Sequence, residues 1–224
     1  MAERRTASLH HEASHTGTLA SVARGWLFLL AAISGFAAEP GKFDYYLLSL
    51  SWSPDFCAGH ATAPECKGTK KYGFVVHGLW PQNERGYPQN CGGPPFNPGK
   101  VPASLPAIMP SGSLQSHEWT KHGTCSGLGQ MEYFQTVERA FRSVNIPAPY
   151  QQPLQNIQVP PQQIKDNFRQ ANSSFPEQGV SVQCSGRYLS EVRVCLGKDL
   201  QPRACAASIR DTCRTPTVIM RPLR

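Results

Sequence analysis

The segment FDYYLLSLSW, residues 43–52, is rich in aromatic and aliphatic side chains. A short apolar run of this kind predicts a buried central strand. The segment YGFVV, residues 72–76, predicts a second short buried strand that delivers His77 at its C-terminal end. Further along the chain, residues 180–184 and 188–196 predict a hairpin. These segments together predict a sheet.

The rest of the chain predicts helices and loops around these strands. Apolar periodicity predicts helices at residues 113–122, 131–144 and 161–172, and a final strand at residues 217–220. Loops are predicted at residues 57–71, 81–113 and 151–161, with a helical turn within residues 103–109. Because strands and helices are mixed without a regular βαβ rhythm, the sequence favours an α+β fold.

Length and composition limit the class of protein. The chain has 224 residues, which suits one globular domain with a sizeable core. A hydrophobic content of 40%, with 4 Trp and 10 Phe, excludes a disordered chain. The 20 Pro and 19 Gly argue against a coiled coil or a helical bundle. The formal net charge of +7 permits an anionic partner such as nucleic acid, but it serves solubility equally well.

The N-terminal region predicts a secretory signal. Residues 26–38 form the apolar run WLFLLAAISGFAA behind a basic segment that contains Arg24. A membrane anchor is the alternative, but a spanning helix needs about 20 apolar residues. We therefore expect residues 1–37 to be a signal peptide, removed by cleavage after Ala37. Residues 38–224 would then form a single domain without membrane contact.

The cysteines indicate an oxidising compartment. All eight follow the predicted signal: Cys57, Cys66, Cys91, Cys125, Cys184, Cys195, Cys205 and Cys213. An even number of cysteines behind a signal predicts up to four disulfides. A zinc cluster is the alternative, but the sequence has no CxxC pair. The spacing alone does not decide how the cysteines pair.

The histidines are concentrated in two short motifs. Beyond residue 38 the chain has four histidines, and three of them lie in HGLWP, which begins at His77, and HEWTKH, which begins at His117. On a helix at about 100° per residue, Glu118, Lys121 and His122 fall within about 140° of His117. A solvated helix face carries Glu and Lys in this way, but it less often carries two histidines beside them. The second motif therefore predicts a chemical site.

The second motif does not match a zinc protease, which needs two histidines four residues apart with Glu between them. The fourth residue after His117 is Lys121, and an ammonium group opposes a divalent cation. A metal-dependent hydrolase has no supporting ligand set in the sequence. We therefore expect neither a metal nor another cofactor.

Imidazoles, a cation and a carboxylate suit the cleavage of RNA without a metal. A neutral imidazole takes the proton of the ribose 2′-hydroxyl, whose oxygen attacks the adjacent phosphorus, and a protonated imidazole donates to the departing 5′-oxygen. An imidazole pKa of about 6.5 suits both tasks. A fixed cation or a protonated histidine stabilises the charge that develops on the non-bridging oxygens. DNA lacks the 2′-hydroxyl and cannot react by this route.

Two longer segments carry a family resemblance. Two segments closely resemble the active-site segments of the ribonuclease T2 family: FVVHGLWP, residues 74–81, and SHEWTKHGTC, residues 116–125. Members of this family are secreted acid endoribonucleases. The resemblance extends to Ser51-Trp52, to the Tyr133-Phe134 helix and to the C-terminal cysteines. It implies an α+β fold in which several helices pack on a central antiparallel sheet and disulfides stabilise the structure.

The resemblance also implies an activity. The protein would be an endoribonuclease that cleaves single-stranded RNA to 2′,3′-cyclic phosphates and then, more slowly, to 3′-phosphates. His77 would be the general acid and His122 the general base. His117 would hold the phosphate, while Glu118 and Lys121 would stabilise the pentacovalent transition state. We expect a monomer that is secreted, or periplasmic in a Gram-negative host.

Aromatic residues in and after the first motif suggest base stacking, and the resemblance suggests further substrate-binding residues and a disulfide pairing. Trp80 and Tyr87 would stack on a base, although packing beneath the catalytic loop suits Trp80 equally well. Ser51 and Leu114 occupy positions that help to choose a base in some relatives, and Gln82 stands where some relatives have an acidic residue. The implied disulfides are Cys91–Cys125, Cys184–Cys213 and Cys195–Cys205, with Cys57–Cys66 as a fourth.

A non-catalytic secreted binding protein on the same scaffold is the alternative function. Degenerate relatives of that kind would lose motif histidines, whereas this chain keeps all three together with Glu118 and Lys121. Asn172-Ser173-Ser174 is a glycosylation sequon, which matters only in a eukaryotic host.

Overall fold

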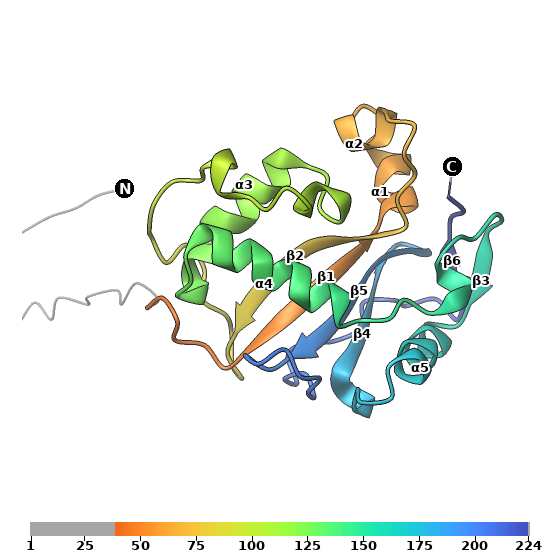
Figure 1. Ribbon diagram of the computed structural model, residues 1–224. Coiled ribbons are helices and arrows are strands. Elements are labelled where there is room, and N and C mark those ends of the chain that lie inside the picture. The colour runs from red at the N-terminus through yellow and green to blue at the C-terminus, as the bar shows by residue number, and fades with distance from the viewer. Residues whose placement is uncertain (1–38, 224) are drawn as a thin grey trace, which may run out of the picture. The chain divides into compact units, whose positions relative to one another are not determined.

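The computed structural model describes residues 39–223, and its centre is a six-stranded sheet (Figure 1). The strand order is β2-β1-β5-β6-β3, and β4 also pairs with β5. The strands are β1 (Tyr45–Trp52), β2 (Phe74–Gln82), β3 (Ile157–Val159), β4 (Val180–Ser185), β5 (Tyr188–Leu196) and β6 (Val218–Met220). The pairs are antiparallel, as expected, except for a parallel bridge between Tyr188 of β5 and Ile219 of β6. The predicted α+β class is confirmed.

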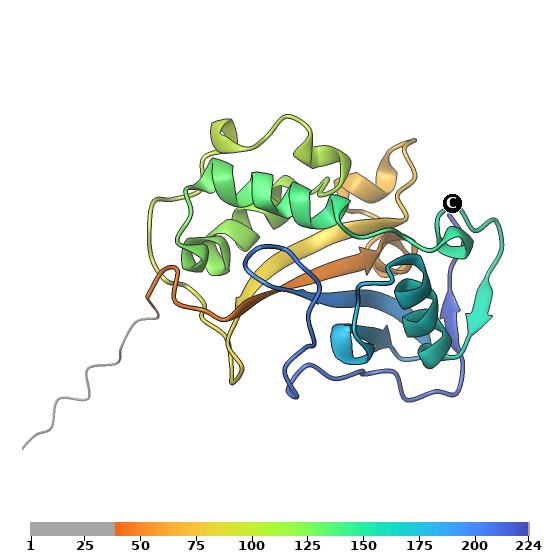
Figure 2. The same cartoon turned by 60° about the horizontal axis from the view of Figure 1, so that its bottom comes forward.

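Several helices pack against this sheet. The α-helices are α1 (Ser53–Gly59), α2 (Pro64–Lys67), α3 (Gly112–Lys121), α4 (Gln130–Arg142) and α5 (Pro161–Ala171). Short 3-10 helices cover Pro98–Lys100, Leu105–Ala107, Gly123–Ser126, Ala148–Tyr150 and Glu177–Gly179. Helix α4 contacts β2, and α5 contacts β4. Figure 2 shows β2, β1 and β5 side by side with α4 next to them.

The two faces of the sheet differ. On one face, alternate β1 residues enter the main hydrophobic core together with α4 and α5: Tyr46, Leu48, Leu50 and Trp52. On the other face, Tyr45 and Leu47 belong to a small second cluster with Cys195. Ser49 and Ser51 follow on this face, so it becomes polar toward the end of β1. The polar part of this face carries the candidate site.

Helix α4 ties the core to β2. Its apolar residues recur at helical spacing, and Tyr133, Phe134 and Val137 are fully buried. The Tyr133 hydroxyl donates a hydrogen bond of 3.0 Å to the carbonyl oxygen of Leu79 in β2. The predicted amphipathic helix is therefore present, and its buried face supports the strand that carries the first motif.

Strand β2 contains a β-bulge at His77. The pairing with β1 skips this residue, because consecutive β1 residues pair with Gly78 and Val76. A regular strand alternates its side chains with period two, which would place His77 and Trp80 on opposite faces. The extra residue of the bulge shifts the alternation by one and brings both side chains to the polar face.

The predicted end of this strand is wrong. The sequence predicts a strand at residues 72–76 with His77 at its C-terminal end. In the structure, β2 begins at Phe74 and continues through His77 to Gln82. Pro81 does not interrupt it, because β2 is the outer strand of its sheet and proline is tolerated there. Two predicted loops also contain short elements: α1 and α2 occupy part of residues 57–71, and β3 lies within residues 151–161.

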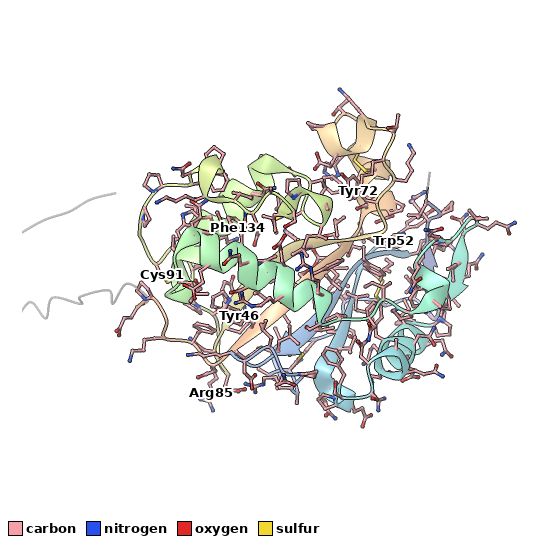
Figure 3. All side chains as sticks on the ribbon, viewed as in Figure 1. Tyr46, Trp52, Tyr72, Arg85, Cys91 and Phe134 are labelled. Carbon is pink, nitrogen blue, oxygen red and sulfur yellow. A yellow bond between two sulfur atoms is a disulfide. The ribbon has the colours of Figure 1, made fainter. Side chains whose placement is uncertain are left out.

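Four disulfides connect the eight cysteines. Their pairs are those that the family resemblance implies: Cys57–Cys66, Cys91–Cys125, Cys184–Cys213 and Cys195–Cys205. Figure 3 shows all described side chains and labels Cys91, which lies in the long loop after β2. The predicted signal peptide lies outside the described residues. Within residues 39–223, no helix is both long and apolar enough to cross a membrane.

The sequon asparagine has a structural role. Asn172 is buried at the end of α5. Its side-chain amide donates to the carbonyl oxygens of Asn145 and Phe168 at 2.8 Å each, and its Oδ1 accepts from the Asn145 amide at 2.7 Å. Because these bonds engage both ends of the side-chain amide, the asparagine closes a turn in the fold.

Candidate active site

Trp80 stands between the histidines of the two motifs. The bulge places the His77 and Trp80 rings nearly perpendicular, with centroids 5.2 Å apart and an angle of 79°. The His122 ring lies 5.3 Å from Trp80. Side chains from β2 and from the end of α3 therefore form one group on the polar face of the sheet.

Glu118 lies in the interior of this group and comes from α3. Its side chain is only 1% exposed, and its Oε1 lies 3.8 Å from Nε2 of His77. Its Oε2 accepts a hydrogen bond of 2.7 Å from the Trp80 indole N–H. Gly78 permits this approach, because a Cβ at position 78 would overlap both Glu118 Oε2 and Trp80 Nε1. The glycine of HGLWP therefore makes room for the glutamate of HEWTKH.

The end of α3 places the other motif residues. His117 is exposed and Lys121 is half-buried, whereas His122 is only 5% exposed. His122 caps the helix, and its backbone N–H donates to the Glu118 carbonyl oxygen at 3.0 Å. The ring of Tyr87, from the loop after β2, lies 6.5 Å from the His122 ring.

A buried carboxylate on β5, Glu191, joins the group from a third element of the fold. Its Oε1 accepts a hydrogen bond of 2.5 Å from His77 Nδ1. Its Oε2 accepts two bonds from Arg193, at 2.8 Å from Nε and 2.6 Å from Nη2. The Arg193 guanidinium also lies over the Trp80 ring, 5.1 Å from its centroid. Glu191 and Arg193 thus contact two residues of the HGLWP motif.

The two central histidines have opposite electrostatic environments. Burial lowers the pKa of His77, but the hydrogen bond and charge of Glu191 and the charge of Glu118 outweigh it, so the pKa rises above 6.5. Burial is also the main reason that the pKa of His122 falls to about 3. The positive charges of Lys121, His117 and His77 lower it further. The site therefore favours a protonated His77 beside a neutral His122.

The pKa values of the two carboxyl groups, Glu118 and Glu191, also shift in opposite directions. Burial raises the pKa of Glu118 to about 7, although His77, Trp80 and Lys121 act in the opposite direction. Burial also raises the pKa of Glu191, but hydrogen bonds and positive charge from His77 and Arg193 outweigh it and lower the pKa to about 2. In weakly acidic solution Glu118 is thus largely neutral, while Glu191 is ionised.

A cleft of about 870 Å³ adjoins His77. His117, Leu114 and Ser51 line it near the ionisable group, and the short helices α1 and α2 form another wall. Lys70 and Lys71 add positive charge to its lining. The cleft is large enough for a small organic ligand. A group of three or more His, Cys, Asp or Glu arranged to hold a metal ion does not occur within residues 39–223.

Comparison with known proteins identifies the family. The sequence model of the ribonuclease T2 family matches residues 43–205, which include both motifs. This chain belongs to the ribonuclease T2 family. A ribonuclease of Aeromonas hydrophila is 35% identical over 178 residues, which cover 72% of this chain and 75% of that protein. Ribonuclease DdI of Dictyostelium discoideum is 29% identical over 200 residues, with 78% and 86% covered.

Solved structures of the T2 family share this fold. Ribonuclease MC1 from the seeds of bitter gourd superimposes with a TM-score of 0.64 at 26% identity, over 79% of this chain and 99% of that one. An RNase-related protein from Calystegia sepium has a TM-score of 0.67 at 24% identity and covers 81% of this chain and 98% of its own. The fold that the family resemblance implies is thus confirmed.

The structure gathers most of the T2 site residues named from the sequence. His77, Glu118 and His122 lie around Trp80. His117, Ser51 and Leu114 line the cleft. Lys121 is close enough for its charge to lower the pKa values of Glu118 and His122. Tyr87 is 52% exposed and borders His122. Gln82 differs from these residues, because it is 5% exposed and its side-chain amide donates to the Pro81 carbonyl oxygen at 3.0 Å. Its part in base recognition stays a prediction.

Sequence reasoning missed Glu191 and Arg193. Both lie in the segment YLSEVRVCL, residues 188–196, where charged residues alternate with apolar ones in a central strand. That alternation was the available signal, since a charged residue in a buried strand needs a partner. The partner of Glu191 is His77, 114 positions away, and the sequence pattern does not show this pairing.

Proposed function

We propose that this T2-family endoribonuclease cleaves single-stranded RNA by transphosphorylation. His122 takes the proton of a ribose 2′-hydroxyl, and the 2′-oxygen attacks the adjacent phosphorus. His77 gives its Nε2 proton to the departing 5′-oxygen as the bond from phosphorus to that oxygen breaks. The product is a 2′,3′-cyclic phosphate, which water hydrolyses to a 3′-phosphate when the two histidines exchange roles.

The opposite environments of the two histidines carry this proposal. A general base must be neutral before the reaction, and His122 has a pKa of about 3. A general acid must be protonated, and carboxyl groups raise the pKa of His77. Two titratable groups with separated pKa values are a physical basis for assigning acid and base. This basis is independent of the family resemblance and leads to the same assignment.

The remaining motif residues suit the charge that develops on phosphorus. Lys121 supplies positive charge for the non-bridging oxygens, and His117 holds the phosphate. Glu118 fits this place because burial raises its pKa to about 7, so that it is largely neutral in acid. Its Oε2 already accepts a hydrogen bond from Trp80. Oε1 can therefore carry the proton of the neutral carboxyl group and donate a hydrogen bond to a phosphate oxygen.

The cleft beside His77 suits the nucleotide downstream of the cleaved bond. His77 protonates the 5′-oxygen, which belongs to that nucleotide, and the cleft begins at His77. A variant of ribonuclease MC1 has been solved with 5′-UMP, so a relative with this fold holds a nucleotide. Trp80 and Tyr87, on the side of His122, suit the upstream base.

Secretion is part of the proposal. Four disulfides close this domain, and disulfides persist in oxidising compartments such as the extracellular space or the periplasm. A domain expressed with its own N-terminal segment should appear outside the cytoplasm with residues 1–37 removed, which mass spectrometry of the secreted protein would show. Retention of the segment in the exported protein would contradict the predicted cleavage.

Analysis of product ends tests the activity. The protein should produce 2′,3′-cyclic phosphate ends on single-stranded RNA, with and without excess EDTA. His77→Ala and His122→Ala should each lower kcat/KM by about 10²–10⁴-fold, since each removes one proton-transfer group. Circular dichroism would verify that both variants fold. Intact RNA at every pH from acidic to neutral would favour a binding protein, and activity abolished by EDTA would favour a metal-dependent hydrolase.

A further inference from the structure

Both carboxylate oxygens of Glu191 accept hydrogen bonds from other side chains. One oxygen accepts from His77 Nδ1 at 2.5 Å, and the other accepts two bonds from Arg193. The Ser51 hydroxyl lies 3.5 Å from the oxygen that His77 uses. The side chain is 11% exposed. A carboxylate this buried stays ionised only when charged hydrogen-bond donors surround it, as they do here.

We propose that Glu191 is the positioning residue of His77, which holds the Nδ1–H of the ring so that only the Nε2 proton is transferred to the leaving 5′-oxygen. This role rests on the proposed function of His77 as the general acid. Glu191 does not touch the reacting atoms and acts through the histidine alone. Arg193 in turn fixes the carboxylate by a two-point contact.

The geometry of the sheet explains why this pairing is specific. His77 and Glu191 belong to β2 and β5, which flank β1. Ser51 of β1 pairs with Glu191 on one side and with Val75 on the other, so these side chains share a face. The bulge keeps His77 on this face and leaves its ring without a partner in β1. The ring therefore reaches across β1 to the carboxylate.

The contact has two chemical consequences for an acid. It fixes the ring, because Nδ1 is bound and Nε2 lies on the side of Glu118, 3.8 Å from its Oε1. It also favours the protonated ring, since an ionised carboxylate stabilises the imidazolium. The titratable groups that face His77 are Glu191 and Arg193 from β5 and Glu118 from α3. Glu191 raises the pKa of His77, Glu118 does so when it is ionised, and Arg193 lowers it. His122 differs, because its buried Nδ1 has no hydrogen-bond partner within residues 39–223.

The leaving group of the substrate separates this role from a merely structural one. A dinucleotide releases a 5′-alkoxide, which needs a proton, whereas a nucleoside 3′-(p-nitrophenyl phosphate) releases a nitrophenolate, which leaves without one. For metal-bound histidines, removal of the carboxylate partner costs about 10–100-fold. Glu191→Ala should lower kcat/KM for the dinucleotide by about that factor, and Glu191→Gln by less. Both variants should cleave the nitrophenyl substrate almost as well as the wild type.

An NMR titration of the histidine rings gives a second measurement. In Glu191→Gln the pKa of His77 should fall, because the neutral amide removes a charge that favours the imidazolium. The alkaline limb of the kcat/KM profile for the dinucleotide should move to lower pH in the same variant. Glu84→Gln is the matched control, because it removes one carboxylate that pairs with Arg203 at the surface. It should change neither the His77 titration nor either rate.

The outcomes distinguish this inference from the proposed function. If His77→Ala loses dinucleotide cleavage but both Glu191 variants keep it within twofold, the positioning role is wrong and the acid role stands. Equal losses on both substrates, or an unchanged His77 titration, would also overturn the inference and indicate that Glu191 supports the fold. If His77→Ala retains dinucleotide cleavage, the proposed function itself fails.

Discussion

Gly78 is the residue at which one added methyl group most directly disturbs the site. A Cβ there would overlap Glu118 Oε2 and Trp80 Nε1. Gly78→Ala must therefore displace the carboxylate or the strand, which costs about 1–3 kcal/mol of unfolding free energy. A displacement of about 1 Å also costs on the order of 10²-fold in kcat/KM. Urea unfolding and RNA cleavage assays would measure the two effects.

Gly112→Ala is the matched control for this substitution. Gly112 opens α3, and an added Cβ would meet open space. Alanine favours a helix over glycine by about 1 kcal/mol, so this variant should be equally active and no less stable than the wild type. Similar behaviour of the two alanine variants would contradict the close approach of Glu118 to β2.

The pKa values of the histidines predict the pH profile of the enzyme. The base works only when neutral, so activity falls as the pH drops through the His122 pKa of about 3. The acid works only when protonated, so activity falls again as the pH rises through the raised pKa of His77. The kcat/KM profile should thus be a bell that covers the acidic range and ends on the alkaline side of 6.5.

Substitution of Lys121 tests the acid limb of this profile. The Lys121 charge opposes protonation of His122, after burial of the ring itself. Lys121→Gln should raise the pKa of His122 and move the acid limb to higher pH, and kcat should fall as well because a cation near the phosphate is lost. A profile of kcat/KM against pH would show the shift. A limb that stays in place or moves to lower pH would disprove the coupling between Lys121 and His122.

Sequence reasoning reached the motif residues because their chemistry is local. His117, Glu118, Lys121 and His122 follow one another within six positions, and helical geometry alone brings them together. His77 and Trp80 were named from a second short motif. Glu191 was not found, because only the pairing of three strands brings it to His77.

At the scale of elements, α3, α4 and α5 were predicted to within two residues of their bounds because their apolar periodicity follows the core, whereas the short helices α1 and α2 fall partly in a predicted loop. In α4 the buried residues recur at the expected spacing. Strand β2 was not predicted to its full length, because the bulge at His77 shifts the alternation on which strand prediction depends. The same β-bulge places the His77 side chain in the site.

The Cys91–Cys125 disulfide joins the loop after β2 to the turn after α3. A hydrogen bond of 2.8 Å from the Asn90 amide to the Lys121 carbonyl oxygen supports the same junction. The bridge spans 34 residues, so removing it with Cys91→Ser and Cys125→Ser should cost about 2–4 kcal/mol of unfolding free energy. The double variant should also cleave RNA more slowly, because Tyr87 and His122 belong to the joined segments.

The Cys57–Cys66 bridge is the internal comparison. It spans 9 residues, and a shorter closed loop restricts the unfolded chain less. Its double serine variant should therefore lose less unfolding free energy in urea titrations than the Cys91–Cys125 variant. An equal or larger loss would show that the α1–α2 segment contributes more to stability than its chain-entropy effect predicts.

Over the whole molecule, the sheet assembles the site from distant segments. Ser51, His77 and Glu191 lie on adjacent strands, and α3 closes the site beside β2. The main core on the opposite face packs against these strands and holds them in place. The composition allowed an α+β fold, but the strand order follows from long-range packing that periodicity does not encode.

The excess of basic over acidic residues leads to a last prediction at this scale. If the charge contributes to RNA binding, each phosphate contacted releases counterions, and log(kcat/KM) falls against log[salt] with a slope of about −0.7 per phosphate for single strands. A dinucleotide has a single phosphate between its nucleosides, whereas a longer oligonucleotide should also place phosphates near Lys70 and Lys71, which line the cleft. The slope should therefore be steeper for the longer substrate. In the double variant Lys70→Gln, Lys71→Gln, the slope should become less steep for the oligonucleotide and stay unchanged for the dinucleotide. Equal slopes for both substrates in the wild-type protein would mean that the charge serves solubility.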